Sequence, residues 1–171
     1  MVEPNGHDSI LSVRGVSKFF GGVRANNDVS IEVPRGKIFA IIGPNGAGKT
    51  SLLNMISGFY VPDAGEITFN SKKISGLKPS EIARQGIART FQNIALFRGM
   101  SVLQNMMLGR HVLMKTSVLS SFVYWGAAQR EEVAHREKVE ELIDFLRLND
   151  LRKAPTGELA YGLQKRVELG R

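Results

Sequence analysis

The hydrophobic positions of the chain change from a continuous run to helical spacing around one central stretch. Residues 38–42 (IFAII) form an apolar run without a polar residue, which is typical of a strand buried on both faces of a parallel sheet. Leu52, Leu53 and Ile56 follow at the spacing of one helical face. The pattern therefore predicts a strand, a connecting loop and a helix over residues 37–59.

Alternating apolar and polar residues on both sides of this stretch predict antiparallel strands. Val29, Ile31 and Val33 share one face of such a strand, whereas Ser30 and Glu32 share the other. The expected strands are Ile10–Phe20, its neighbour Asn27–Val33, a hairpin over Glu66–Ile74 that turns at Asn70 and Ser71, and a short strand at Ile87–Phe91.

The second half of the chain is predicted to be mainly helical. Ser101 and Gln104 have the spacing of a capping box, so a helix is expected from there to about Leu113. Residues 115–126 have no clear period and predict a loop or a short helix. Other helices are expected at Ser80–Gln85, at Gln129–Leu148, and in the last stretch to Arg171 after a polar loop over Asn149–Gly157.

The loop after the apolar run reads GPNGAGKT over Gly43–Thr50 and fits the phosphate-loop pattern. Without a Cβ, Gly46 and Gly48 can take backbone angles that direct successive N–H groups toward an anion at a helix N-terminus. The Lys49 ammonium is then expected to reach the β- and γ-phosphates, and the Thr50 hydroxyl to ligate Mg²⁺. The pattern predicts nucleotide binding; the alternative is a glycine-rich turn beside an exposed lysine.

Composition narrows the remaining functions. The chain has 23 Lys and Arg against 16 Asp and Glu, a net charge of +7, but the charges are scattered, so a solvated surface is favoured over a nucleic-acid site. The absence of cysteine excludes disulfides and thiolate metal sites. No apolar run approaches the length of a membrane span, and the first residues show no signal pattern. We therefore expect a cytosolic chain that meets a membrane only through a partner.

Three motifs in a fixed order, GPNGAGKT, RTFQN and LAYGLQKR, resemble those of the ATP-binding subunit of an ABC transporter. The resemblance covers the chain from about Ile10 to its last residue. The segments FGGVRANNDVS, SGFYVPDAGEI and GIARTFQNIALFRGMSVLQNMMLGRH further resemble the ATP-binding subunits of high-affinity branched-chain amino-acid importers. Urea and short-amide importers have similar subunits and stay an alternative.

The resemblance implies an α/β fold, the P-loop NTPase core of an ABC ATPase with an N-terminal antiparallel β subdomain and a helical subdomain. Residues 1–171 would form a partial nucleotide-binding domain. Within it, residues 10–92 would be the β subdomain and phosphate-loop core, and residues 93–171 the helical subdomain up to the signature helix. The C-terminal part of the parallel sheet is expected to be missing.

The resemblance also assigns roles to individual residues. Phe20 matches the aromatic residue that stacks on adenine, with Phe19 as the alternative. Gln92 matches the glutamine that contacts Mg²⁺ or the attacking water, and Gly162 the signature glycine that contacts the γ-phosphate held by the partner subunit. The expected ATP site is Phe20, Gly43, Pro44, Asn45, Gly46, Ala47, Gly48, Lys49, Thr50, Ser51, Ala160, Tyr161 and Gly162, with Thr50 and Gln92 at Mg²⁺ and Gln92 as the catalytic residue.

The sequence departs from the family pattern at several places. Ala160 stands where many relatives carry serine, and Leu163 where glutamine or an acidic residue is commoner. No run of four apolar residues precedes an acidic residue, so the Walker B glutamate is absent, and all three histidines precede the signature: His7, His111 and His135. The chain is therefore expected to be truncated, and by itself not competent in hydrolysis. A non-catalytic nucleotide-binding fragment and an ABC-type ATPase unconnected with transport are the alternatives.

The partners implied by the resemblance are the membrane permease subunits of an importer and a second ATP-binding subunit, identical or not. A periplasmic solute-binding protein would take part indirectly, and nucleic acid is not expected. The chain would then lie peripherally on the cytoplasmic side of the plasma membrane, where ATP hydrolysis drives amino-acid uptake.

Overall fold

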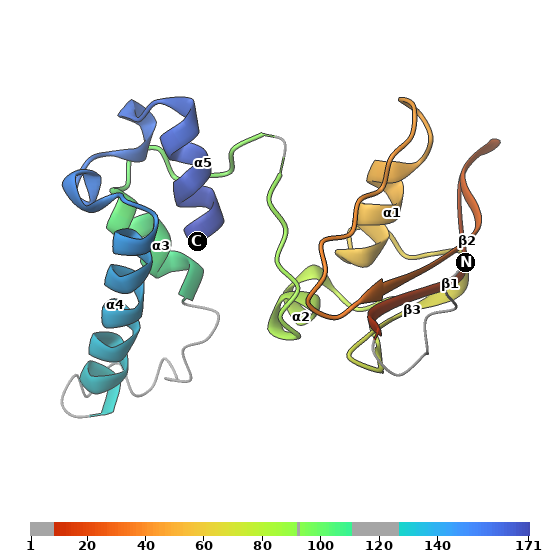
Figure 1. Cartoon of the computed structure of the whole chain (residues 1–171), viewed down its shortest axis with the longest axis horizontal. Coiled ribbons are helices and arrows are strands. Elements are labelled where there is room, and N and C mark those ends of the chain that lie inside the picture. Colours follow the sequence, from red (N-terminus) through yellow and green to blue (C-terminus); the bar gives the residue numbers. More distant parts are fainter. Residues whose placement is uncertain (1–8, 92, 111–126) are drawn as a thin grey trace. The chain divides into compact units, whose positions relative to one another are not determined.

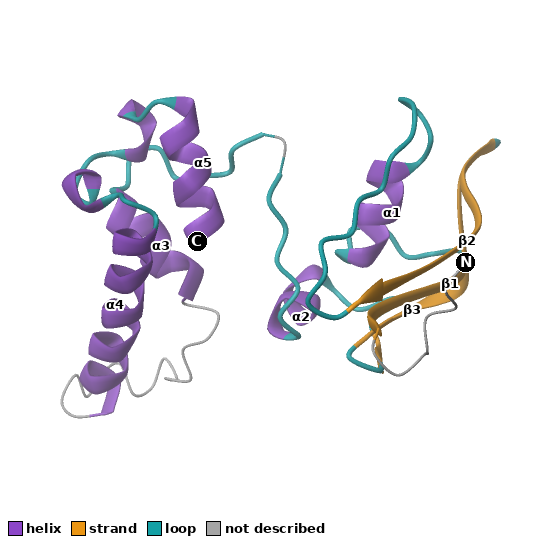
Figure 2. Ribbon diagram, in the orientation of Figure 1, coloured by secondary structure: helices purple, strands orange, loops and turns teal. Residues whose placement is uncertain are grey.

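A computed structural model of the chain describes residues 9–91, 93–110 and 127–171, with the side chains of the last range described from residue 133. The chain divides between Arg89 and Thr90 into two units. Figure 1 follows the elements along the sequence, and Figure 2 separates helices from strands. In chain order the strands and helices are β1 (Ser9–Phe20), β2 (Val23–Pro34), α1 (Lys49–Ile56), β3 (Ala64–Phe69), β4 (Lys72–Lys73), α2 (Pro79–Arg84), α3 (Val102–Arg110), α4 (Ala127–Phe145) and α5 (Tyr161–Gly170), with 3-10 turns at Asn149–Leu151 and Thr156–Glu158 before α5.

The first unit contains an antiparallel sheet of four strands in the order β2-β1-β3-β4. Val13 of β1 lies opposite Ile31 on one side and Ile67 on the other, so the alternation predicted from the sequence sets the register. Asn70 and Ser71 have φ angles of 48° and 62°, the left-handed conformation of a type I′ hairpin turn. The antiparallel strands and the hairpin are thereby confirmed.

Helix α1 and the sheet bury a shared apolar core in this unit. Leu52 and Met55 of α1 are 3% and 1% exposed, whereas Leu53 is 43% exposed. The predicted apolar face was therefore wrong at one residue. The buried face of α1 contains Met55, whereas Leu53 points to solvent. The buried members of this core are Val13, Val16, Leu52, Met55, Ile67, Ile74 and Ile82.

Two predicted strands are not formed. Residues 38–42 and 87–91 have no strand pairing in the structure. Ile38 and Ile42 are 102% and 92% exposed, the opposite of the buried strand that their composition predicts. A strand of this type is held by parallel neighbours on both sides, and the part of the chain that the structure describes forms only the antiparallel sheet.

The second unit is built from α3, α4 and α5 around its own core. Ser101 Oγ accepts from the Gln104 N–H (3.2 Å) and Gln104 Oε1 accepts from the Ser101 N–H (2.9 Å), which confirms the predicted capping box. Val139 and Ile143 of α4 are fully buried, as the helical stripe predicts. The buried residues of this core are Val102, Met106, Val139, Ile143, Leu148, Leu159 and Val167.

Some predictions fall on residues outside the described ranges. These are the end of the α3 helix near Leu113, the stretch 115–126, and Gln92. Among the described residues, no helix combines the length and the apolar composition needed to cross a membrane.

Candidate nucleotide-binding site

The loop Gly43–Thr50 leads directly into α1, as the phosphate-loop pattern predicts for its helix. Gly46 and Gly48 have φ angles of 84° and 81°, the left-handed region that favours glycine. A Cβ on Gly48 would lie 2.1 Å from the Ala25 carbonyl oxygen, so this position also lacks room for any side chain. Gly48 caps the N-terminus of α1, where free N–H groups and the helix dipole favour an anion.

The Lys49 side chain folds back over the loop instead of pointing into solvent. Its ammonium donates to the carbonyl oxygens of Gly43 (2.7 Å) and Pro44 (2.5 Å). Lys49 is half-buried and Thr50 is exposed at the start of the helix. The arrangement places one positive charge against the first two residues of the loop, and the next residue in sequence carries a hydroxyl.

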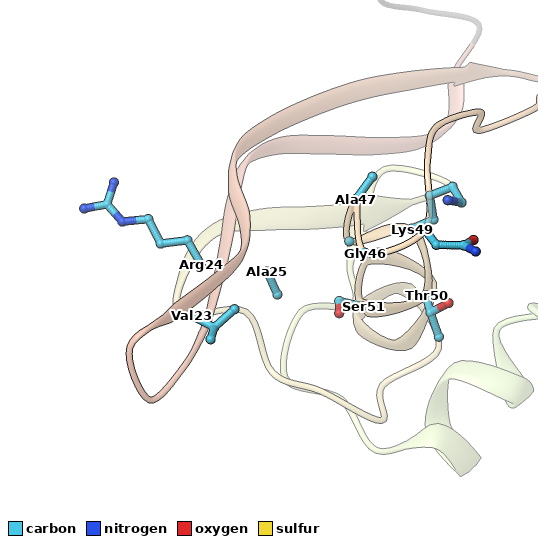
Figure 3. A pocket seen from close by; sticks show the side chains of 10 residues that line it. Val23, Arg24, Ala25, Gly46, Ala47, Lys49, Thr50 and Ser51 are labelled. Atoms are coloured by element: carbon cyan, nitrogen blue, oxygen red, sulfur yellow. The ribbon is translucent and has the colours of Figure 1, made fainter.

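A pocket of about 290 Å³ opens at this loop. Figure 3 shows that the first residues of β2 lie across the pocket from the loop and the first turn of α1. Arg24 and Lys49 are the charged residues of its lining, and Figure 3 shows that the Arg24 side chain extends away from the loop. The Lys49 charge and the N-terminus of α1 therefore give the pocket its preference for an anion. The lining residues are Val23, Arg24, Ala25, Asn45, Gly46, Ala47, Gly48, Lys49, Thr50 and Ser51.

The contribution of β2 to this pocket was missed from the sequence. Asn26 is only 7% exposed, and its side-chain amide donates to the Gly48 carbonyl oxygen (3.3 Å). Together with the close approach of Ala25 to Gly48, this bond fixes the loop against the sheet. The residues concerned, Val23–Asn26, lie between the two predicted strands and contain no phosphate-binding pattern. Their position beside the phosphate loop becomes evident only in the folded structure.

The two aromatic candidates for adenine stacking lie at the end of β1. Phe19 and Phe20 are 40% and 42% exposed, so exposure does not distinguish them. The Phe20 ring makes an edge contact with Tyr60, with ring centroids 5.1 Å apart. Phe19 lies opposite Arg24 in the register of β1 and β2, and the Arg24 guanidinium lies 6.0 Å from its ring.

Asp63 fixes the backbone that carries both rings. Its carboxylate accepts from the Phe19 N–H (2.7 Å) and from the Lys18 ammonium (2.9 Å). These two bonds, the one from Phe19 first, hold the pKa of Asp63 below its ordinary value. The carboxylate therefore stays ionised at neutral pH and keeps the end of β1 in place.

The expected signature residues lie at the start of α5 in the second unit. Ala160 is the N-cap and Tyr161 the first helical residue, and the Ala160 carbonyl accepts from the Leu163 N–H (2.9 Å). Gly162 is exposed, and a Cβ there would meet nothing within 4 Å. An anion can therefore approach the backbone closely at Gly162. These residues belong to the second unit, whereas the phosphate loop belongs to the first.

Comparison with known proteins identifies the family. A family model described as "ABC transporter" matches residues 26–171. The chain belongs to the ABC transporter family. The match begins at Asn26 and includes the phosphate loop and the expected signature residues, so both fall inside the conserved domain of that family.

Several curated ABC transporter proteins are similar to nearly the whole chain. The high-affinity branched-chain amino acid transport ATP-binding proteins LivG of Salmonella typhimurium and BraF of Pseudomonas aeruginosa are each 37% identical over 162 residues. A probable LivG protein of Methanocaldococcus jannaschii is 39% identical over 164 residues. These alignments cover 95% of this chain but only 62–64% of the relatives, so the chain spans less than two thirds of their length.

Solved ABC cassettes share the fold. The ADP conformation of MJ1267, an ATP-binding cassette of an ABC transporter, is 38% identical, with a TM-score of 0.79 over 95% of this chain and 63% of that one. The cbiO1 protein of Clostridium perfringens, part of the cbiONQ transporter complex, is 28% identical with a TM-score of 0.76. The ABC ATPase fold predicted from the sequence is confirmed for the part of the domain that this chain covers.

Proposed function

We propose that the chain is part of the ATP-binding subunit of an ABC importer that takes up branched-chain amino acids. The observation that carries this proposal is the loop Gly43–Thr50, whose glycine conformations, lysine placement and position at the start of α1 suit the β- and γ-phosphates of ATP. The similarity to LivG and BraF supports branched-chain amino acids as the solute.

Each unit would contribute to a different nucleotide: the first unit to the ATP of this subunit, and the second unit to the ATP of a second subunit. The pocket at the loop would hold ATP, with Thr50 and Gln92 as the ligands of Mg²⁺ and Phe20 or Phe19 on the adenine. The start of α5, with Ala160, Tyr161 and Gly162, would contact the γ-phosphate held by a second ATP-binding subunit. Mg²⁺ would neutralise phosphate charge and help to orient the attacking water.

The membrane partner would be the permease of the importer. Phe97 and Met100 lie in the loop before α3 and are 51% and 39% exposed, which gives an apolar surface for a permease helix. Because the expected partner crosses the membrane, the subunit would lie peripherally on its cytoplasmic side. A solute-binding protein would act on the complex only through the permease.

Nucleotide binding is tested by Lys49→Ala. The substitution removes the positive charge that would meet the β- and γ-phosphates, so we expect binding of a fluorescent ATP analogue with Mg²⁺ to be lost. Lys73→Ala, at an exposed residue of β4, is the matched control and should bind like the wild type. Equal affinity of wild type and Lys49→Ala would overturn the phosphate-loop assignment.

A further inference from the structure

Helix α5 carries a row of charged residues that contacts a segment far away in the sequence. Lys165, Glu168 and Arg171 follow one another at intervals of three residues, so they share one side of the helix. The Lys165 ammonium donates to the Phe91 carbonyl oxygen (2.5 Å), and the Arg171 guanidinium donates to that of Ala95. Phe91 and Ala95, which precede α3 in the chain, therefore contact α5 within the second unit, whose elements are shown in Figure 1.

Glu168 contributes a hydrogen-bond acceptor to the same contact, in which Lys165 and Arg171 are donors. Its side chain is only 8% exposed and accepts from the Lys165 ammonium (2.7 Å), the Phe91 N–H (3.4 Å) and the Ala95 N–H. Burial alone raises the pKa of Glu168, but the bonds from Lys165, Phe91 and Ala95 outweigh burial and hold it below its ordinary value. The carboxylate is thus ionised at neutral pH and faces backbone donors, while the ammonium faces a backbone acceptor.

A second lysine–glutamate pair, on α4, has the same spacing as the pair on α5 but a different degree of exposure. Lys138 and Glu141 on α4 have the same spacing of three residues and a comparable distance of 2.8 Å. Their side chains are 59% and 63% exposed, and the Lys138 ammonium donates to both carboxylate oxygens of Glu141 (2.9 and 2.8 Å). An exposed pair of this kind contributes little to stability, whereas the enclosed α5 pair satisfies backbone groups of another segment.

We propose that Lys165 and Glu168 act as a clasp that fastens Phe91 and Ala95 to α5, so that these two residues move together with Gly162. This inference rests on the proposed function, which supplies the role of Gly162. Lys165 and Glu168 are positioning residues, since they hold backbone and have no assigned contact with nucleotide.

A charge swap separates the clasp from a simple pair within the helix. In the double variant Lys165→Glu, Glu168→Lys the intrahelical pair is kept, and its order along the helix becomes the more favourable one. The swap places a carboxylate against the Phe91 carbonyl and an ammonium against two N–H donors, so the clasp is broken. The matched control is the same swap on α4, Lys138→Glu with Glu141→Lys.

Amide hydrogen exchange at Phe91 and Ala95, followed by NMR, provides the measurement. We expect exchange at both amides to become roughly tenfold faster or more in the α5 swap, the change that loss of a bond to a charged group predicts. The α4 swap should leave both amides unchanged. Unchanged exchange in the α5 swap overturns the clasp.

A second variant and a binding measurement cover the cases in which the charge swap does not fold or the wild type does not bind nucleotide. If the swap unfolds α5 by circular dichroism, Glu168→Gln replaces it, because this variant keeps the shape and removes the charge; wild-type exchange at both amides in Glu168→Gln overturns the clasp. Binding of the fluorescent ATP analogue is measured on the same samples and should be unaffected, since the clasp lies outside the phosphate loop. Failure of the wild type to bind the analogue would overturn the proposed function and leave the exchange result to decide the clasp.

Discussion

At the scale of single residues, the phosphate loop shows two different reasons for glycine. Gly46 and Gly48 have nearly the same positive φ, so a side chain at either position would be strained. Only Gly48 also meets a neighbour, because a Cβ there would lie 2.1 Å from the Ala25 carbonyl oxygen, whereas at Gly46 nothing lies within 4 Å. The sequence pattern marks both positions equally, and only the fold separates them.

We therefore expect Gly48→Ala to be more harmful than Gly46→Ala. Gly46→Ala should lower the free energy of unfolding by about 1–2 kcal/mol, the cost of the left-handed conformation for a residue with a Cβ. Gly48→Ala should cost more, since β2 or the loop must also move apart. Urea denaturation of both variants is the measurement, and equal costs would contradict a close approach of β2 to the loop.

At the scale of elements, the buried side chain of Asn105 connects α3 with the loops at its N-terminal end. Its amide nitrogen donates to the carbonyl oxygens of Phe97 (3.0 Å), Met100 (3.2 Å) and Ser101 (3.1 Å), and its oxygen accepts from the Phe97 N–H (2.9 Å). The Thr156 hydroxyl adds a bond to the Phe97 carbonyl (3.0 Å). The exposed Phe97 ring therefore belongs to a loop whose backbone is held by the fully buried side-chain amide of Asn105.

Replacing this amide by an apolar group of similar size tests that arrangement. Asn105→Leu leaves the Phe97 N–H and several carbonyl groups without their partner, at about 1–3 kcal/mol for each buried group that stays unsatisfied. We expect a clear fall in melting temperature, measured by circular dichroism. Asn149→Leu is the control, because the Asn149 bond to Asp144 is exposed and its loss should change stability by less than about 0.5 kcal/mol. Equal effects of the two substitutions would mean that the Asn105 network has no structural role.

The elements also show how far sequence reasoning reaches. Local signals succeeded: the capping box at Ser101 and Gln104 and the turn at Asn70 and Ser71 depend on residues within a few positions of one another. The predicted strand over 38–42 failed, because its pairing depends on strands that are distant in the sequence. For the same reason the role of Asn26 beside the phosphate loop could not be predicted from its neighbours.

At the scale of the whole molecule, the first unit folds around an antiparallel sheet while exposing an apolar run. Ile38, Phe39, Ile41 and Ile42 are at least 36% exposed, and this run lies next to the proposed nucleotide loop in sequence. The composition of the run is that of an interior strand, but in this chain it contributes nothing to the core formed by β1, β3, α1 and α2. Exposed apolar surface of this kind favours self-association.

Substitution of this run by polar residues should therefore leave folding intact and improve solution behaviour. Ile38→Ser with Ile42→Ser removes two side chains that are 102% and 92% exposed, so we expect an unchanged melting temperature and reduced self-association by light scattering. Val13→Ser, at a residue that is 1% exposed, is the contrasting variant and should lower the melting temperature strongly, because it buries a hydroxyl and opens a cavity. If the double variant at 38 and 42 melted as early as Val13→Ser, the apolar run would have to be part of the folded core, and the strand predicted from the sequence would exist after all.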